Sequence, residues 1–176
     1  MMDYLDYTAA GRGLNKIFVG EILVILSFIP LLGAILALIG LILIMVGLNE
    51  ASAAAEGYRT AFWLGIASIV VTVLSLFLPI LSLVSDILAF AIVYFVCITT
   101  ADILDTNGDP ATATKGRFVW KLYIVCTIIM VICGLLALIP GVAVLAALVI
   151  IPTAIASIVA GIQYLIFLYR ASTFLA

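Results

Sequence analysis

The sequence contains no histidine, and charged residues make up only 9% of its 176 positions. The lack of histidine excludes imidazole-based acid–base catalysis, histidine triads and most zinc sites. Soluble globular domains carry roughly a quarter charged residues, so a chain this poor in charge and 68% hydrophobic is predicted to lie in a lipid bilayer. A formal charge of −2, spread over few side chains, leaves no basic face, so a nucleic-acid partner is not expected.

Cysteine and the common catalytic motifs are also scarce. Cys97, Cys126 and Cys133 lie in apolar runs without C-x-x-C spacing, which predicts reduced packing residues and no disulfide framework. The sequence lacks the phosphate-binding loop, the dinucleotide-binding glycine pattern and the G-x-S-x-G nucleophile turn. We therefore expect no enzyme activity, no cofactor and no metal site.

A D-x-N-x-D pattern begins at Asp105 and resembles the start of a calcium loop. Such loops need glycine at the sixth position and a bidentate glutamate at the twelfth, where this chain has Pro110 and Gly116. The segment is instead predicted to be a turn with a helix stop at Asn107 and Gly108.

Three long apolar blocks are each interrupted near the middle by a proline, at Pro30, Pro79 and Pro140. Proline breaks a helix and neighbouring glycine accepts turn geometry, so each interruption is predicted to reverse the chain. The predicted fold class is all-α: a polytopic integral membrane protein with six transmembrane helices in three tandem hairpins with proline-containing turns. The expected helices are 14–29, 31–55, 59–78, 81–104, 117–139 and 142–170.

Residues 1–176 are predicted to form a single membrane domain. Its hairpins would span about 14–55, 59–104 and 117–170, and residues 1–13 and 171–176 would be short cytoplasmic tails. The hairpins share an outline of polar lead, apolar rise and proline turn, but their spacings differ, so a pseudo-threefold arrangement stays open. Pro152 falls inside the sixth expected helix and predicts a kink there.

All seven Lys and Arg residues lie toward the hairpin bases and chain ends, away from the proline turns. The positive-inside rule assigns that side to the cytoplasm, so both termini are expected there, in a bacterial-type plasma membrane. The turns themselves are almost wholly apolar. Two topologies are therefore considered. In one the hairpins cross the bilayer fully; in the other the turns stop short of the far surface and are covered by lipid or by a partner.

Glu21 is the most conspicuous candidate for function, because it lies inside the first expected helix among apolar neighbours. A carboxylate at that depth is costly to bury and by default marks an ion or substrate path or a paired charge. The alternative is that Glu21 reaches interfacial water or pairs with Arg12, Lys16 or a base of another helix.

Uncharged polar residues lie at depths comparable to Glu21 and define a predicted inward polar zone. If they converge, they line a hydrated pocket suited to a cation or neutral polar solute; otherwise they bond their own helices or serve as packing contacts. The candidates beside Glu21 are Asn49, Tyr94, Thr99, Tyr123, Thr127 and Gln163.

Asp86 is the one charge near the turns. A short carboxylate after a broken helix suits a helix N-cap, so capping of the fourth helix is the favoured reading, with an intramembrane site as the alternative. It is a secondary site candidate.

Small residues recur every seven positions on two expected helices, which favours close, gently left-handed helix crossings. These faces are predicted to form intramolecular or oligomer contacts. They comprise Gly33, Gly40 and Gly47 on the second helix and Ala147, Ala154 and Gly161 on the sixth.

The leading hypothesis is a small membrane transporter, channel or solute-binding membrane subunit that handles a cation or polar solute through the zone around Glu21. The rival is a structural or assembly subunit, or a membrane-shaping scaffold, without transport activity. Expected partners are the lipid bilayer and either a second copy of the chain or a membrane partner protein.

Overall fold

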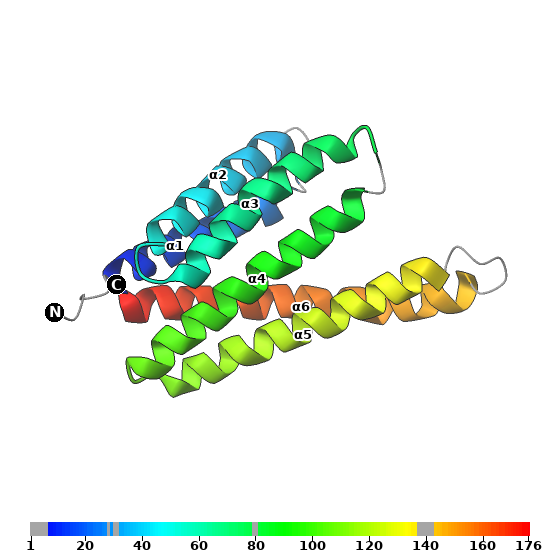
Figure 1. Cartoon of the computed structure of the whole chain (residues 1–176). Helices are drawn as coiled ribbons and strands as arrows, with labels where there is room; N and C mark the ends of the chain where they lie inside the picture. The colour runs from blue at the N-terminus through cyan, green and yellow to red at the C-terminus, as the bar shows by residue number, and fades with distance from the viewer. Residues whose placement is uncertain (1–6, 28, 30–31, 79–80, 137–142) are drawn as a thin grey trace.

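The computed structural model describes residues 7–27, 29, 32–78, 81–136 and 143–176, and this part of the chain is helical without strands. The turn prolines Pro30, Pro79 and Pro140 lie outside the described residues. Figure 1 shows the helices in chain order, and they are α1 (Tyr7–Leu26), α2 (Gly33–Ala51), α3 (Glu56–Ser75), α4 (Leu81–Thr106), α5 (Pro110–Leu136) and α6 (Ala143–Leu175).

The helices have the length and composition of membrane spans. The shortest, α2, has 19 residues and is about 28 Å long at 1.5 Å per residue, close to the roughly 30 Å hydrocarbon core. Five helices, α2 to α6, are long and apolar enough to cross a membrane. The remaining helix, α1, is equally long but carries Arg12, Lys16 and Glu21. The fold is that of an all-helical integral membrane protein.

Three helices extend further than the apolar blocks predict. α1 begins at Tyr7, α5 begins at Pro110, and α6 continues through Pro152 to Leu175. The α5 start has a local cause: Gly108 has a φ of 95°, and the next residue, Asp109, accepts a 3.0 Å hydrogen bond from the Thr112 backbone N–H. Asp109 is therefore the N-cap and Pro110 the first helical residue, a favourable pair at a helix start.

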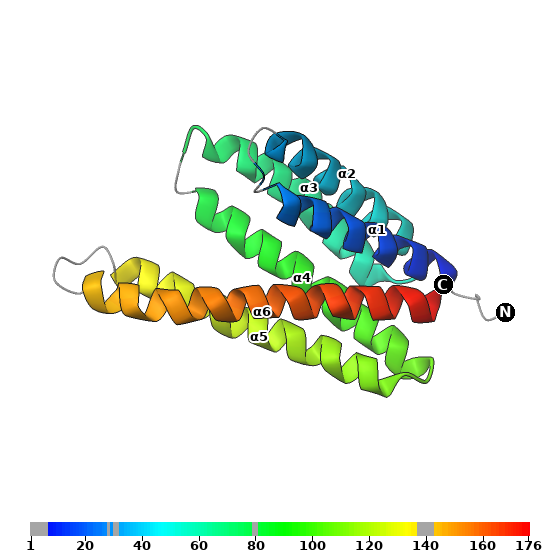
Figure 2. The same ribbon diagram turned by 180° about the vertical axis from the view of Figure 1, so that it is seen from behind.

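The helices pack in a closed series in which each contacts its neighbours along the chain and α6 returns to contact α1. Figures 1 and 2 show both described chain ends at the same end of the bundle, where α1, α3 and α5 begin and α2, α4 and α6 end. We call this the basic end, because every Lys and Arg lies toward it, and the opposite one the turn end. In both views α5 and α6 diverge from α1 to α4 toward the turn end.

The buried core is concentrated toward the basic end. Its largest fully buried side chains include Tyr58, Phe167, Leu14 and Leu48. The exterior is apolar along the bundle, with Leu76 and Phe77 of the turn end 80% and 79% exposed. A soluble protein rarely leaves apolar surface this continuous in water, whereas lipid covers it at no cost.

Glycines bring α1 and α2 into backbone contact at two levels. A Cβ on Gly20 would lie 2.6 Å from the Gly40 carbonyl oxygen, and one on Gly13 would lie 2.5 Å from that of Gly47. The reverse contacts are equally short in each pair. Only glycine permits this approach, because the opposing atoms are backbone and cannot rotate away.

The other small-residue positions have different surroundings. A Cβ on Gly33 would meet the Ser27 backbone next to it in the α1–α2 connection. On α6, Ala154 is half-buried, whereas a Cβ on Gly161 would meet nothing within 4 Å. The side chain of Ala147 lies outside the described residues.

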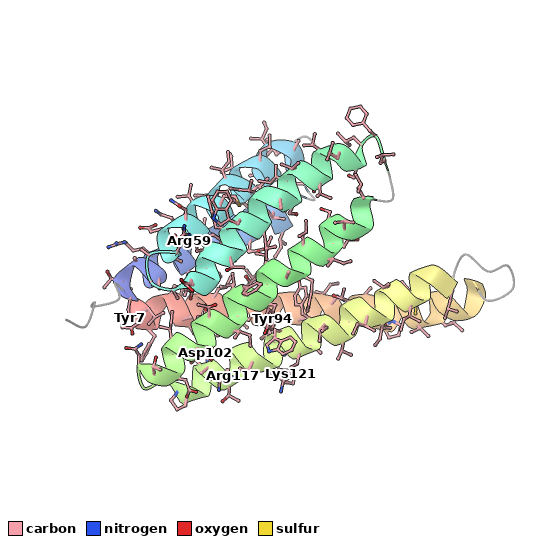
Figure 3. The ribbon with its side chains drawn as sticks, in the orientation of Figure 1. Tyr7, Arg59, Tyr94, Asp102, Arg117 and Lys121 are labelled. Carbon is pink, nitrogen blue, oxygen red and sulfur yellow. The ribbon has the colours of Figure 1, made fainter. Side chains whose placement is uncertain are left out.

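Two bridged acid–base groups join helices at the basic end. Glu50 of α2 accepts hydrogen bonds from Arg12, at 3.1 Å, and from Lys16, both on α1. Arg117 of α5 donates to Asp102 and Asp105 of α4, at 3.1 and 2.9 Å, and Figure 3 shows Arg117 near Asp102. Most of these side chains are solvent-exposed, so each pair adds little to the stability of the fold.

Candidate functional site around Glu21

Glu21 lies well inside the bundle, about 21 Å from the start of α1 at 1.5 Å per residue. It follows Ile17 and Phe18 by one helical turn, so it shares their side of α1. Ile17 is 1% exposed in the core, and the Phe18 ring packs 5.5 Å from that of Tyr169 on α6. This side of α1 therefore faces the interior and α6, and it carries the half-buried Glu21 with it.

Two phenols from other helices lie within electrostatic range of Glu21. They are Tyr123 of α5 and Tyr164 of α6. The two rings meet edge to face with centroids 6.5 Å apart. Tyr164 is only 4% exposed, whereas Tyr123 is half-buried. A phenol donates one hydrogen bond and accepts others, so the pair offers oxygen ligands beside a carboxylate.

Polar side chains continue from Tyr164 toward the basic end. Tyr164, Cys97 of α4 and Tyr58 of α3 are buried in the same core. The Tyr58 hydroxyl forms a 2.6 Å hydrogen bond with the Thr100 hydroxyl of α4, and both residues are fully buried. We call these residues the inner polar cluster: Glu21, Tyr58, Cys97, Thr100, Tyr123 and Tyr164.

Glu21 has no base for a partner. Within the described residues it forms neither an ion pair nor a hydrogen bond. The alternative in which it pairs with Arg12 or Lys16 is wrong, because both bases bind Glu50. The spacing explains this result: Arg12 and Lys16 are four residues apart and share a face, whereas Lys16 and Glu21 are five apart and do not.

The cluster suits some ligands better than others. Among the described residues, no three Cys, Asp or Glu side chains gather as a metal site would require. One carboxylate with neighbouring hydroxyls provides a single negative charge and several hydrogen-bonding oxygens. This set matches a proton, a small monovalent cation or a cationic or neutral polar solute, and it disfavours an anion.

The inward polar zone predicted from sequence is only partly brought together. Glu21 and Tyr123 lie within electrostatic range of each other, and Thr127 donates to the Tyr123 carbonyl of its own helix at 2.9 Å. Tyr94, labelled in Figure 3, packs edge to face on Trp120 with centroids 5.2 Å apart.

Three members of the predicted zone lie on other surfaces. Asn49 is exposed at the end of α2. The Thr99 side chain is pressed against α3, where a Cβ on Gly57 would overlap its hydroxyl. Gln163 lines a hollow on the outer side of α5 and α6.

Asp86 does not cap α4. The helix already begins at Leu81, so Asp86 lies inside it, on an exposed part of its surface. The capping reading assumed an irregular stretch after Pro79, but α4 starts almost at once. The neighbouring Ser85 exchanges a 2.7 Å hydrogen bond with Thr72 of α3.

Sequence reasoning missed Tyr58, Cys97, Thr100 and Tyr164. Tyr58 lies near a helix start, so its position in the sequence predicts an aromatic residue at the membrane interface. Cys97 lies in an apolar run, which predicts a packing residue. Tyr164 follows Ala160 by four residues and precedes Ala171 by seven, a small-residue face that signals the inner side of α6. This spacing of small residues could have identified Tyr164 as an interior residue from the sequence.

Comparison of the chain with known protein families, curated proteins and solved structures finds no match.

Proposed function

We propose that this chain is a small membrane transporter, channel or solute-binding membrane subunit, and that Glu21 binds its cation or polar solute. The observation that carries the proposal is an unpartnered, half-buried carboxylate well inside the bundle, with two phenols from other helices in electrostatic range. Carboxylates at such depth are rare and usually serve ion or solute paths. The bases nearest in sequence are held by Glu50, so neither competes with an incoming ligand for Glu21.

The path in this proposal runs from the basic end to Glu21. Tyr58 and Thr100, then Cys97 and Tyr164, supply polar groups in that order along the bundle. Hydroxyls that reorient can pass a proton or replace part of a cation's water shell. Toward the turn end, α5 and α6 diverge from α1 to α4 (Figures 1 and 2).

The proposed topology has six spans, including α1, in three hairpins with the basic end in the cytoplasm. Its support is the concentration of every Lys and Arg at that end. Ala34 near the turn end and Ala111 at the basic end are both exposed helix positions.

Orientation can be tested by labelling single cysteines in intact cells after the native cysteines are replaced by serine. An impermeant maleimide is expected to label Ala34→Cys from outside and to label Ala111→Cys only after lysis. Permeabilised cells, in which both sites must react, provide the control. Labelling of Ala111→Cys in intact cells would show that the basic end lies outside the cell and would overturn the proposed orientation.

Glu21→Gln tests the function itself. In proteoliposomes, proton and sodium flux driven by a potassium diffusion potential is expected to fall about tenfold or more, because the amide cannot carry the charge that a cation requires. Glu56→Gln is the matched control: it makes the same change at an exposed carboxylate in the first turn of α3. Its flux is expected to equal that of the wild type.

The flux assay does not detect transport of a neutral solute. Native mass spectrometry of protein released from mild detergent is therefore carried out as a second measurement. A small molecule retained by the wild type and by Glu56→Gln, but lost from Glu21→Gln, is the expected result for solute capture. Equal flux and equal retained masses in all three proteins would overturn the role of Glu21.

A structural or assembly subunit is the second candidate. The observation that favours it is Gly161 on α6, whose Cβ position faces open space beside Ile158 and Ile162, 64% and 52% exposed. Such a position admits the close approach of another helix. Co-purification of a second protein at fixed stoichiometry, with flux unaffected by Glu21→Gln, would favour this reading.

A further inference from the structure

A groove on the outer side of α5 and α6 near the basic end is separate from the Glu21 cluster. It encloses about 300 Å³ between one face of α5 and one face of α6. Lys115, Phe118 and Val119 line it from α5, at positions i, i+3 and i+4. The two helices are neighbours that run in opposite directions (Figure 2). The residues that line the groove extend along both of them, from Lys115 to Val119 on α5 and from Gln163 to Arg170 on α6.

The groove has an apolar floor and exposed apolar walls. Val119 and Phe167 form the floor and are 2% and 1% exposed. Phe118 and Ile166 form the walls and are 55% and 48% exposed. The Phe167 ring occupies the space of a side chain at Gly116, which holds α5 and α6 close beneath the groove.

Two bases stand at the outer lip of the groove. Lys115 precedes Phe118 on α5, and Arg170 follows Ile166 on α6, so both lie on the basic-end side of the apolar walls. Unlike Arg117, neither forms an ion pair or hydrogen bond within the described residues. Arg170 also borders a second hollow on its other side, with Asp109 and Tyr169.

The acid nearest these bases is already engaged. Hydrogen bonds from the Thr112 side chain and backbone hold the pKa of Asp109 below its usual value, with smaller contributions from Lys115 and Arg170. Asp109 is the N-cap of α5, so its carboxylate points to the helix start. Asp109 keeps its negative charge, but two bases against one acid leave the lip with a net positive charge.

Charge and hydrophobicity change along the groove in the same order as along a phospholipid. The bases at the lip match an anionic phosphate, and the walls below match the first methylenes of an acyl chain. Gln163 lies about 10 Å along α6 from Arg170, toward the membrane interior, and its amide can donate to an ester carbonyl. Basic pockets between membrane helices bind anionic headgroups by this complementarity.

We propose that the α5–α6 groove is a binding site for one anionic phospholipid, with Lys115 and Arg170 holding its phosphate. The site does not depend on the role of Glu21. Each base near a membrane surface favours an anionic lipid about fivefold, so the pair is expected to favour it about thirtyfold over a zwitterionic lipid at low salt.

The test uses a fluorescent reporter in the groove wall. Phe118→Trp is introduced after both native tryptophans, Trp63 and Trp120, are replaced by phenylalanine. The protein is reconstituted in phosphatidylcholine vesicles and quenched with brominated phosphatidylglycerol or, separately, brominated phosphatidylcholine. Phosphatidylglycerol is expected to quench at much lower mole fraction, and the preference is expected to weaken as salt screens the charges.

Charge-removing variants then assign the preference to the groove. Lys115→Gln with Arg170→Gln is expected to abolish it, and Arg170→Lys is expected to retain most of it. Lys121→Gln is the matched control, because Lys121 is an exposed, unpaired base of α5 outside the groove. Equal helicity and elution volume verify that each variant is folded.

Two results would overturn the proposal. One is an undiminished phosphatidylglycerol preference in the double variant, or an equal loss of preference in Lys121→Gln. The other is displacement of the lipid by inorganic phosphate at matched ionic strength, which would identify the site as one for a free anion.

Discussion

Gly20→Ala is expected to lower the free energy of unfolding by about 2 kcal/mol or more, although alanine is the better helix former by about 1 kcal/mol. The added methyl group would lie 2.6 Å from the Gly40 carbonyl oxygen and 2.7 Å from the Ile44 side chain. Since the carbonyl is backbone, relief requires α1 and α2 to move apart. That movement also weakens the contact one level away between Gly13 and Gly47.

Gly161→Ala is the matched control, because its methyl group would enter open space on α6. It is expected to leave the free energy of unfolding unchanged or to raise it by up to about 1 kcal/mol, the difference in helix propensity. Both variants are compared by reversible unfolding in mixed micelles, followed by tryptophan fluorescence. Equal stability of Gly20→Ala and the wild type would contradict the backbone contact between α1 and α2.

Glu21→Leu is expected to act in the opposite direction and to raise the free energy of unfolding by about 1–3 kcal/mol. An unpartnered carboxylate inside a membrane bundle is a cost that the folded state bears, and leucine of similar length removes it. Most substitutions of interior residues destabilise, so a gain would be diagnostic of a carboxylate retained for function.

Glu56→Leu is the control for hydrophobicity alone. Glu56 is exposed in the first turn of α3, so its replacement is expected to change the free energy of unfolding by less than about 0.5 kcal/mol. The same unfolding measurement applies. A loss of stability in Glu21→Leu would mean that the carboxylate has structural partners, and it would count against a ligand-binding role.

The helices were the most predictable part of this molecule. Apolar runs broken by proline locate α2, α3 and α4 within a few residues, because bilayer thickness fixes how long a span must be. The true starts of α1 and α5 were not predictable in this way. Their first turns are short of large apolar residues, but Ala10 of α1 and Ala113 of α5 are fully buried in the core, and Asp109 caps α5.

The site was predictable in part. Depth in an apolar run singled out Glu21, since a charge there is unusual whatever the fold. Its neighbours depend on helix rotation, which hydropathy does not report when nearly every residue is apolar. Tyr123 could be predicted because it lies at a depth in the bilayer similar to that of Glu21. Tyr164 could not be predicted, because the sequence does not show which face of α6 points toward α1. Gly13 and Gly20 escaped notice because their heptad spacing gains meaning only opposite Gly40 and Gly47.

The uneven distribution of the core also affects how the molecule responds to its lipid. The basic end is held by the large buried side chains and by the two bridged acid–base groups. Toward the turn end, α5 and α6 diverge from the other helices, and lipid supplies more of their surroundings. We therefore expect a change in bilayer thickness to be absorbed by tilting of the helices at the turn end, while the basic end keeps its geometry.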